Sequence, residues 1–259
     1  MNDTHAHLDT LSPEVLQETL RDTQGFALLL SVASRIDDLQ TTLTLAETYP
    51  WIYAAIGLHP VEAERLAGLE RLAALSSHPR VRALGESGLD LYWHPETEAL
   101  QWKALEAQAL LAAQANLPLV LHIRSAPGSD QAERAMARWI REAPPLRLVL
   151  HAFSGHYELL EAGLERDAYF SFAGPLTYKR NESLRQAARL VPLERILIET
   201  DSPFLPPEPF RGQVNRPSWV RQTLDRLAEL RQLSPEEAEA AVDANARRCF
   251  RLTEGPSAS

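Results

Sequence analysis

The stretch Asp3-Thr4-His5-Ala6-His7-Leu8-Asp9, at the start of the chain, guides the interpretation of everything that follows it. Two histidines separated by one residue project to the same side of an extended strand. Neutral imidazole is the commonest protein ligand of transition metals, so the pair supplies half of a coordination shell. An isolated pair is more often an incidental feature of an exposed polar segment. It indicates a metal site only if the fold brings further ligands to it.

Composition sets the size and class of the protein. The chain has 259 residues, 45% of them hydrophobic, which is enough for a single large domain with a full core. Its net charge is −9, from 26 basic and 35 acidic residues, which argues against a broad basic surface that holds duplex DNA. Bound cations and a few local arginines can still reverse the electrostatic field inside a cleft.

Other features bear on the compartment. No apolar stretch is long enough to span a bilayer, and no basic region followed by an apolar run marks a signal peptide. The single cysteine, Cys249, excludes an internal disulfide and fits a reducing compartment. We therefore expect a cytoplasmic protein that does not associate with membranes. The sequence leaves the oligomeric state open, with a monomer favoured.

Short apolar runs alternate with longer amphipathic stretches along the chain. The expected strands cover residues 3–7, 26–33, 51–58, 81–86, 117–123, 146–152, 168–172 and 196–200. The expected helices cover residues 13–23, 36–48, 61–77, 96–115, 130–142, 157–166, 181–190, 217–231 and 235–250. Eight strand–helix units, with no G-x-G-x-x-G motif after the first strand, predict an α/β fold of the (β/α)8 TIM-barrel type. We expect one domain over residues 1–253 and a flexible tail at 254–259.

Polar side chains cluster where the predicted strands end. The carboxyl ends of barrel strands converge on one face, where active sites are built. The residues brought there are His5, His7, His59, Glu86, Asp90, His122, Arg124, His151 and Asp201. Six of them, the imidazoles of His5, His7, His122 and His151 and the carboxylates of Glu86 and Asp201, are the candidate ligands. Six ligands exceed what a single tetrahedral ion needs, so we expect two divalent ions roughly 3.5–4 Å apart.

Strand adjacency divides the ligands between the two ions. His5, His7 and Asp201 come from neighbouring strands of a closed barrel and are expected to hold one ion. His122 and His151 are expected to hold the other, with Glu86 as the bridge. Asp201 is then placed to orient a shared water and take its proton, which makes Glu86 and Asp201 the catalytic pair. Mixed nitrogen and oxygen ligands suit zinc or manganese, and magnesium suits a weaker site.

The motifs that carry this ligand set resemble the TatD family of metal-dependent DNases. They are D-T-H-A-H-L-D at 3–9, I-G-L-H-P at 56–60, G-E-S-G-L-D at 85–90, L-H-I-R at 121–124, H-A-F-S-G at 151–155, E-T-D-S-P-F-L at 199–205, R-G-Q-V-N-R-P at 211–217 and N-A-R-R-C-F at 245–250. The resemblance implies the same six metal ligands. It adds His59, Asp90 and Arg124 near the substrate phosphate, and Arg211 and Asn215 in the loop after the last strand. The chain departs from the family pattern at Ser87, where an aliphatic residue is usual.

The resemblance implies a divalent-metal-dependent deoxyribonuclease. Its expected partner is DNA, and the enzyme is expected to act as an exonuclease at single-stranded or frayed 3′ ends. A metal-activated hydroxide would attack the phosphorus, and Arg124 would stabilise the developing charge. The ligand set alone specifies hydrolysis and not the substrate. Two alternatives stay open: an ester or amide hydrolase, including a D-aminoacyl-tRNA deacylase, and a barrel that binds metal or a partner without turnover.

Several residues near the expected site have two interpretations. Asp90 either fixes His122 or begins the next loop, and Glu199 supports the ligands from behind. Tyr92 and Trp93 either stack on a nucleobase or close the barrel mouth. The basic side chains after the seventh and eighth predicted strands either form a local basic rim or belong to an ordinary solvated surface; they are Lys179, Arg180, Arg211 and Arg216.

Overall fold

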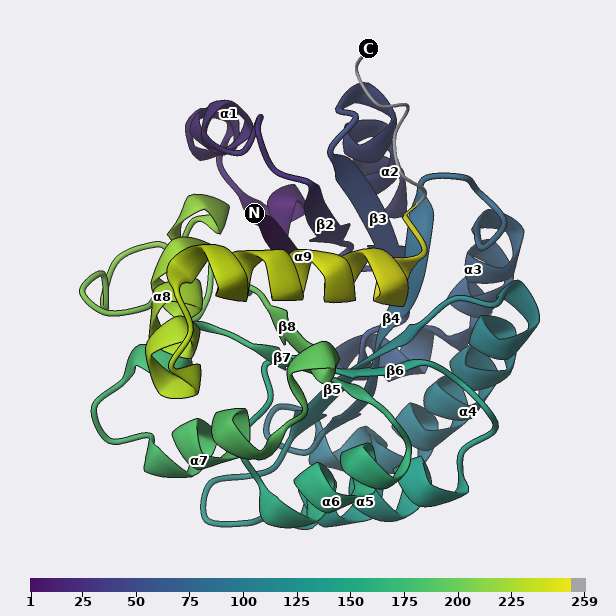
Figure 1. Ribbon diagram of the computed structural model, residues 1–259. Helices are drawn as coiled ribbons and strands as arrows, with labels where there is room; N and C mark the ends of the chain where they lie inside the picture. The colour runs from purple at the N-terminus through teal and green to yellow at the C-terminus, as the bar shows by residue number, and fades with distance from the viewer. Residues whose placement is uncertain (253–259) are drawn as a thin grey trace.

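The computed structural model describes residues 1–252, which form eight parallel strands arranged in chain order around one sheet (Figure 1). The strands are β1 (Asn2–Ala6), β2 (Leu28–Val32), β3 (Ile52–Ile56), β4 (Val81–Asp90), β5 (Leu119–Arg124), β6 (Leu148–Leu150), β7 (Tyr169–Phe172) and β8 (Ile196–Ile198). The helices are α1 (Pro13–Asp22), α2 (Leu39–Thr48), α3 (Leu69–Leu75), α4 (Glu98–Ala115), α5 (Gln131–Glu142), α6 (Tyr157–Glu165), α7 (Glu182–Leu190), α8 (Val220–Arg231) and α9 (Pro235–Phe250). The predicted (β/α)8 barrel is confirmed. The tail predicted at 254–259 lies outside the described residues.

The sheet closes where β1 meets the segment that follows β8. Ala6 forms a parallel bridge with Ser202, and the Asp201 amide donates to the His5 carbonyl at 2.9 Å. The His7 amide donates to the Ser202 carbonyl at 2.8 Å. These bonds join the motif at residues 3–9 to the motif at 199–205 at the carboxyl end of the barrel.

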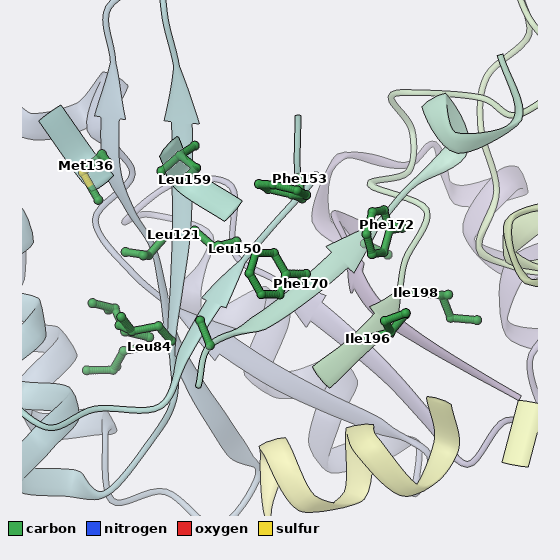
Figure 2. Packing of buried hydrophobic residues seen from close by; sticks show 14 of the residues in the cluster. Leu84, Leu121, Met136, Leu150, Phe153, Leu159, Phe170, Phe172, Ile196 and Ile198 are labelled. Carbon is green, nitrogen blue, oxygen red and sulfur yellow. The ribbon is translucent and has the colours of Figure 1, made fainter. Parts of the chain in front are cut away.

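Two apolar layers hold the barrel together. The outer layer lies between strands and helices; Figure 2 shows part of it, with Leu121 and Leu150 on the strands and Met136 and Leu159 on the helices. The inner layer fills the barrel and includes Phe250 of α9, the helix that crosses in front of the strands in Figure 1. Asn245 of α9 donates to the Ile196 carbonyl at the start of β8. Helix α9 therefore covers the amino-terminal end of the barrel.

The prediction of a helix over residues 61–77 is wrong for the first half of this range. Residues Pro60–Gly68 form 3-10 turns in which Glu62 and Arg65 have non-helical backbone angles, and α3 begins only at Leu69. Tertiary contacts explain the departure. The Glu62 carboxylate accepts from the Ile36 amide at 2.7 Å, and Arg65 binds Asp37, which pulls this segment onto the loop after β2.

Strand β4 continues four residues beyond its predicted end at Glu86. The strand includes Gly88, which lies beyond the predicted end. Gly88 has a φ of +142°, and a Cβ there would lie 2.1 Å from the His122 carbonyl oxygen. Only glycine lets β4 approach β5 this closely. The extension places Asp90 directly beside the site described next.

No helix within residues 1–252 is both long enough and apolar enough to cross a membrane.

Candidate metal centre

Strand alternation sets which side chains point into the barrel. Val120 and Val149 belong to the inner apolar layer, so His122 and His151, two residues further along β5 and just beyond the end of β6, face the same interior. Leu197 likewise precedes Glu199 by two residues. The inner face thus changes from apolar to polar at the carboxyl end of the strands.

Glu86 lies at the centre of the predicted ligands. Its Oε1 is 3.3 Å from Nε2 of both His5 and His7, and its Oε2 is 3.0 Å from His122 Nδ1 and 3.4 Å from His151 Nε2. One carboxylate oxygen thus faces His5 and His7, and the other faces His122 and His151. This is the geometry of a bridging carboxylate.

Asp201 completes the group around His5 and His7. Its Oδ1 lies 3.4 Å from His7 Nε2, 3.8 Å from His5 Nε2 and 3.9 Å from His151 Nε2. The two histidines of β1 face the same way, with their Nε2 atoms 3.4 Å apart. All six side chains predicted as ligands meet at this point.

Three of the imidazoles are anchored through the nitrogen that faces away from Glu86. His7 Nδ1 lies 3.1 Å from the Val32 carbonyl, and His122 Nε2 lies 3.0 Å from Asp90 Oδ2. His151 Nδ1 lies 2.9 Å from Glu199 Oε1. The Val32 carbonyl and the Asp90 carboxylate hold the proton of His7 and of His122 on the outer nitrogen and leave a lone pair on the inner one, as in metal-ligating histidines, whereas Glu199 makes an ionic contact with His151.

The charges of the site favour a cation. Burial raises the pKa of the Glu86 carboxyl, but the His151 and His5 imidazoles outweigh burial and hold that pKa well below its usual range. Burial lowers the pKa of His151, yet Glu199 and Glu86 raise it to about 10. Ionised carboxylates thus draw positive charge onto the imidazoles. The donor set fits a divalent metal, because such an ion supplies that charge when the imidazoles are neutral ligands.

His59 is next to this cluster but differs from it in protonation. Burial and the neighbouring His122 lower the pKa of His59 to about 3, so its ring is neutral. Its Nδ1 accepts from the Val61 amide at 3.1 Å, which leaves the proton on Nε2, 3.8 Å from Glu86 Oε2. His59 is therefore arranged as a hydrogen-bond donor more than as a ligand, consistent with its predicted place near the substrate.

A cavity of about 770 Å³ opens over the cluster. Arg124, which lines it, stacks its guanidinium 4.1 Å above the Tyr92 ring and pairs with no carboxylate within residues 1–252. Trp93 and Phe204 also line the cavity and are 60% and 55% exposed. Phe204 is absent from the sequence predictions, although its position three residues after Asp201 places it in the same motif.

The other two predicted substrate residues differ in position, because Asp90 lines this cavity and Arg211 does not. Asp90 is buried against His122, and its Oδ1 accepts from the Tyr92 and Trp93 amides, so it positions a ligand and a loop. Arg211 lines a different cavity. Asn215, in the loop after β8 as expected, is buried and donates to the Thr200 carbonyl at 2.8 Å.

Ser34 is a further residue that the sequence did not reveal. Its hydroxyl lies 3.0 Å from His7 Nδ1 and donates to Asp9 Oδ1 at 3.1 Å. It follows β2 by two residues, and a search of every strand end for partners of the ligand histidines would have found it.

A barrel that gathers imidazoles and carboxylates at the carboxyl ends of its strands is the architecture of a metal-dependent hydrolase. The chain belongs to the TatD related DNase family, whose sequence model matches residues 2–251. It is 34% identical over 256 residues to the metal-dependent hydrolase YabD of Bacillus subtilis, covering 96% of this chain and 98% of YabD. It is 33% identical over 232 residues to the 3′-5′ ssDNA/RNA exonuclease TatD of Citrobacter rodentium, covering 87% of each chain. The crystal structure of YjjV, a TatD homologue from Escherichia coli K12, superimposes with a TM-score of 0.84 at 31% identity over 98% of both chains. The chain is accordingly a metal-dependent hydrolase.

Proposed function

We propose that this hydrolase cleaves phosphodiester bonds of single-stranded DNA, working as an exonuclease from a 3′ end. The observation that carries the proposal is the surface beside the ligand cluster. An unpaired guanidinium, Arg124, shares one cavity with two exposed aromatic rings, Trp93 and Phe204. A guanidinium suits a phosphate and an aromatic ring suits an unstacked base. The relative from Citrobacter rodentium, named a 3′-5′ ssDNA/RNA exonuclease, supports the same substrate class and polarity.

Two divalent ions are the proposed cofactors. His5, His7 and Asp201 would hold one, His122 and His151 the other, and Glu86 would contact both. Bound there, such ions supply Lewis acidity toward the phosphoryl oxygens and lower the pKa of water. Zinc and manganese suit the mixed nitrogen and oxygen donors, and magnesium suits a weaker site.

The protein's own groups perform the remaining tasks. Asp201 is ionised, because His7 and His151 overcome the effect of burial and lower its pKa, so it can orient the attacking water and receive its proton. Arg124 neutralises charge on the phosphate, and His59 donates from Nε2 to a phosphoryl oxygen. Trp93 and Phe204 hold the base that duplex DNA would keep stacked and inaccessible.

Digestion of end-labelled single-stranded DNA tests this proposal. Metal-stripped protein is re-supplied with Mg²⁺, Mn²⁺ or Zn²⁺ and incubated with strands labelled at either end. We expect metal-dependent shortening from the 3′ end, abolished by Glu86→Ala and by Asp201→Asn. The exposed Glu64 offers a matched control, since Glu64→Ala should digest DNA like the unchanged protein. Stoichiometric metal uptake without cleavage, together with activity on carbonyl esters, would reject the nuclease proposal.

A further inference from the structure

A second cavity, of about 530 Å³, lies between the loop after β7 and the loop after β8. None of the six candidate metal ligands lines this cavity. The residues that line it are Tyr178, Lys179, Arg180, Asn181, Glu208 and Arg211.

The charge of this cavity is opposite to that of the chain. Three cations face a single carboxylate there, although the protein carries a net charge of −9. Lys179 and Arg180 are exposed, and neither forms an ion pair with any residue among 1–252. Arg211 forms a long ion pair with Glu208, at 3.9 Å, and lies 4.4 Å above the Tyr178 ring. Clustered cations without partners indicate an anionic ligand.

Buried contacts fix the shape of the cavity. Arg185 is 6% exposed and donates to the carbonyls of Tyr178 and Lys179, which holds the backbone that presents the two cations. The Tyr178 hydroxyl donates to the Pro206 carbonyl at 2.9 Å and ties the two loops together. A ligand therefore meets a preorganised site and does not need to order these loops.

Helix α7 begins at the same cavity. Asn181 occupies its N-cap position but directs its side-chain amide to the Pro175 carbonyl at 3.2 Å, and no side chain of the described chain caps the first turn. The dipole of α7 adds a partial positive charge at this end of the helix, although Glu182 of the first turn offsets part of it.

We propose that this cavity binds a backbone phosphate of the same nucleic-acid strand whose end occupies the metal centre. The loop after β8 lines both cavities, with Phe204 and Leu205 in the first and Glu208 and Arg211 in the second. Only Pro206 and Pro207 separate Leu205 from Glu208, so the Cα atoms of these two residues are at most about 11 Å apart, a distance that a strand of a few nucleotides can bridge. This inference rests on the proposed function, because it requires a polynucleotide in the first cavity.

Binding of a long and a short strand tests the inference. All-phosphorothioate oligothymidylates of three and nine nucleotides retain their charge and resist hydrolysis, so they suit the metal-loaded, full-length protein. We expect K179Q/R180Q to lower the ratio of nonamer to trimer affinity about tenfold, measured by fluorescence anisotropy. The slope of log K against log salt for the nonamer should fall by about 0.7 to 1.4, which corresponds to one or two phosphate contacts.

A charge-matched variant distinguishes a site from general electrostatics. Lys103 and Arg138 are exposed on the outer helices α4 and α5, and K103Q/R138Q removes the same charge elsewhere. An equal fall in the ratio of nonamer to trimer affinity for both double variants would overturn the inference. An effect confined to nonamers that bear a 5′-phosphate would also overturn it, because the cavity would then bind a terminal phosphate and not a backbone phosphate. The strands are not cleaved in this binding measurement, so its result is independent of the digestion assay. Failure of the nuclease proposal would appear in the digestion assay.

Discussion

Arg124 is the side chain that most clearly separates substrate binding from metal binding. Its guanidinium lines the cavity, stacks on Tyr92 and makes no ion pair within residues 1–252. We expect Arg124→Ala to lower kcat/KM on DNA by about 10- to 100-fold, the loss of a charged hydrogen-bonding partner worth about 1.5–3 kcal/mol. Metal content should be unchanged. Steady-state kinetics with metal analysis checks this, with Arg138→Ala as the control, and a parallel loss of bound metal would contradict it.

Trp93 tests whether the cavity recognises bases. More than half of its side chain is exposed at the cavity wall, where a base could stack. We expect Trp93→Ala to weaken binding of an oligothymidylate roughly tenfold, within the 1–3 kcal/mol of a base–aromatic stack. Binding of an abasic strand of equal length should change little. Equal losses on the two strands, measured by anisotropy, would show that Trp93 supports the fold or the phosphate site instead.

Residue chemistry was the most predictable feature of the site. The six side chains that were predicted as ligands, from histidines and acids at strand ends, lie close together, and imidazole and carboxylate are the donors that metals require. The supports of these residues were harder to predict. His7 is anchored by the Val32 carbonyl, and no sequence pattern specifies a backbone acceptor brought in from another strand.

Among the elements, α4 braces the strand ends that carry the site. Buried Gln108 accepts from the Leu58 amide at 2.8 Å and donates to the Leu58 carbonyl and the Ser87 hydroxyl. The bond from Gln108 to the Ser87 hydroxyl also accounts for a polar residue at position 87, where the resemblance led us to expect an aliphatic one. The neighbouring Gln101 makes a similar pair of bonds with the Asp90 backbone.

Removing this brace should destabilise the protein. Gln108→Ala leaves buried groups of Leu58 and Ser87 without partners, each costing about 1–3 kcal/mol, so we expect the free energy of unfolding to fall by at least about 2 kcal/mol. Urea denaturation measures the change. The control is Gln186→Ala on the exposed face of α7, which should shift the midpoint little. If the urea midpoint of Gln108→Ala differed from that of the unchanged protein as little as the midpoint of Gln186→Ala does, the bracing role would be refuted.

Element boundaries were predicted less well than element types. Strand β4 was predicted to end at Glu86, whereas the positive φ angles of Gly85 and Gly88 let it continue against β5 to Asp90. The 3-10 turns at 60–68 depend on the tertiary bond from the Ile36 amide to Glu62. Local propensity does not contain such contacts, so it misplaces ends while the alternation of strands and helices stays correct.

At the scale of the whole molecule, α9 closes one end of the barrel and leaves the other for chemistry. Cys249 on this helix is fully buried, and burial raises the pKa of its thiol. We expect no reaction with a thiol reagent at pH 8 in the native state and one reactive thiol per chain in urea. A colorimetric thiol assay with and without denaturant checks this. Rapid native labelling would mean that α9 does not stay docked.

The barrel as a whole was predictable because its evidence is repeated eight times. Each strand–helix unit supports the same topology, and closure brings the ends of the first and last strands together through His5 and Asp201. The second cavity was not predictable, since it depends on two loops meeting through the Tyr178 hydroxyl. Its cations were visible in the sequence only as a basic rim or an ordinary surface.

Anomalous diffraction from crystals grown with Mn²⁺ or Zn²⁺ is the most direct test of the metal centre. We predict two anomalous peaks at the carboxyl end of the barrel, one on each side of the Glu86 carboxylate. His5, His7 and Asp201 should contact the first, and His122 and His151 the second. Peaks only at surface sites, or none at all in protein that digests DNA, would contradict a catalytic metal pair held by these six side chains.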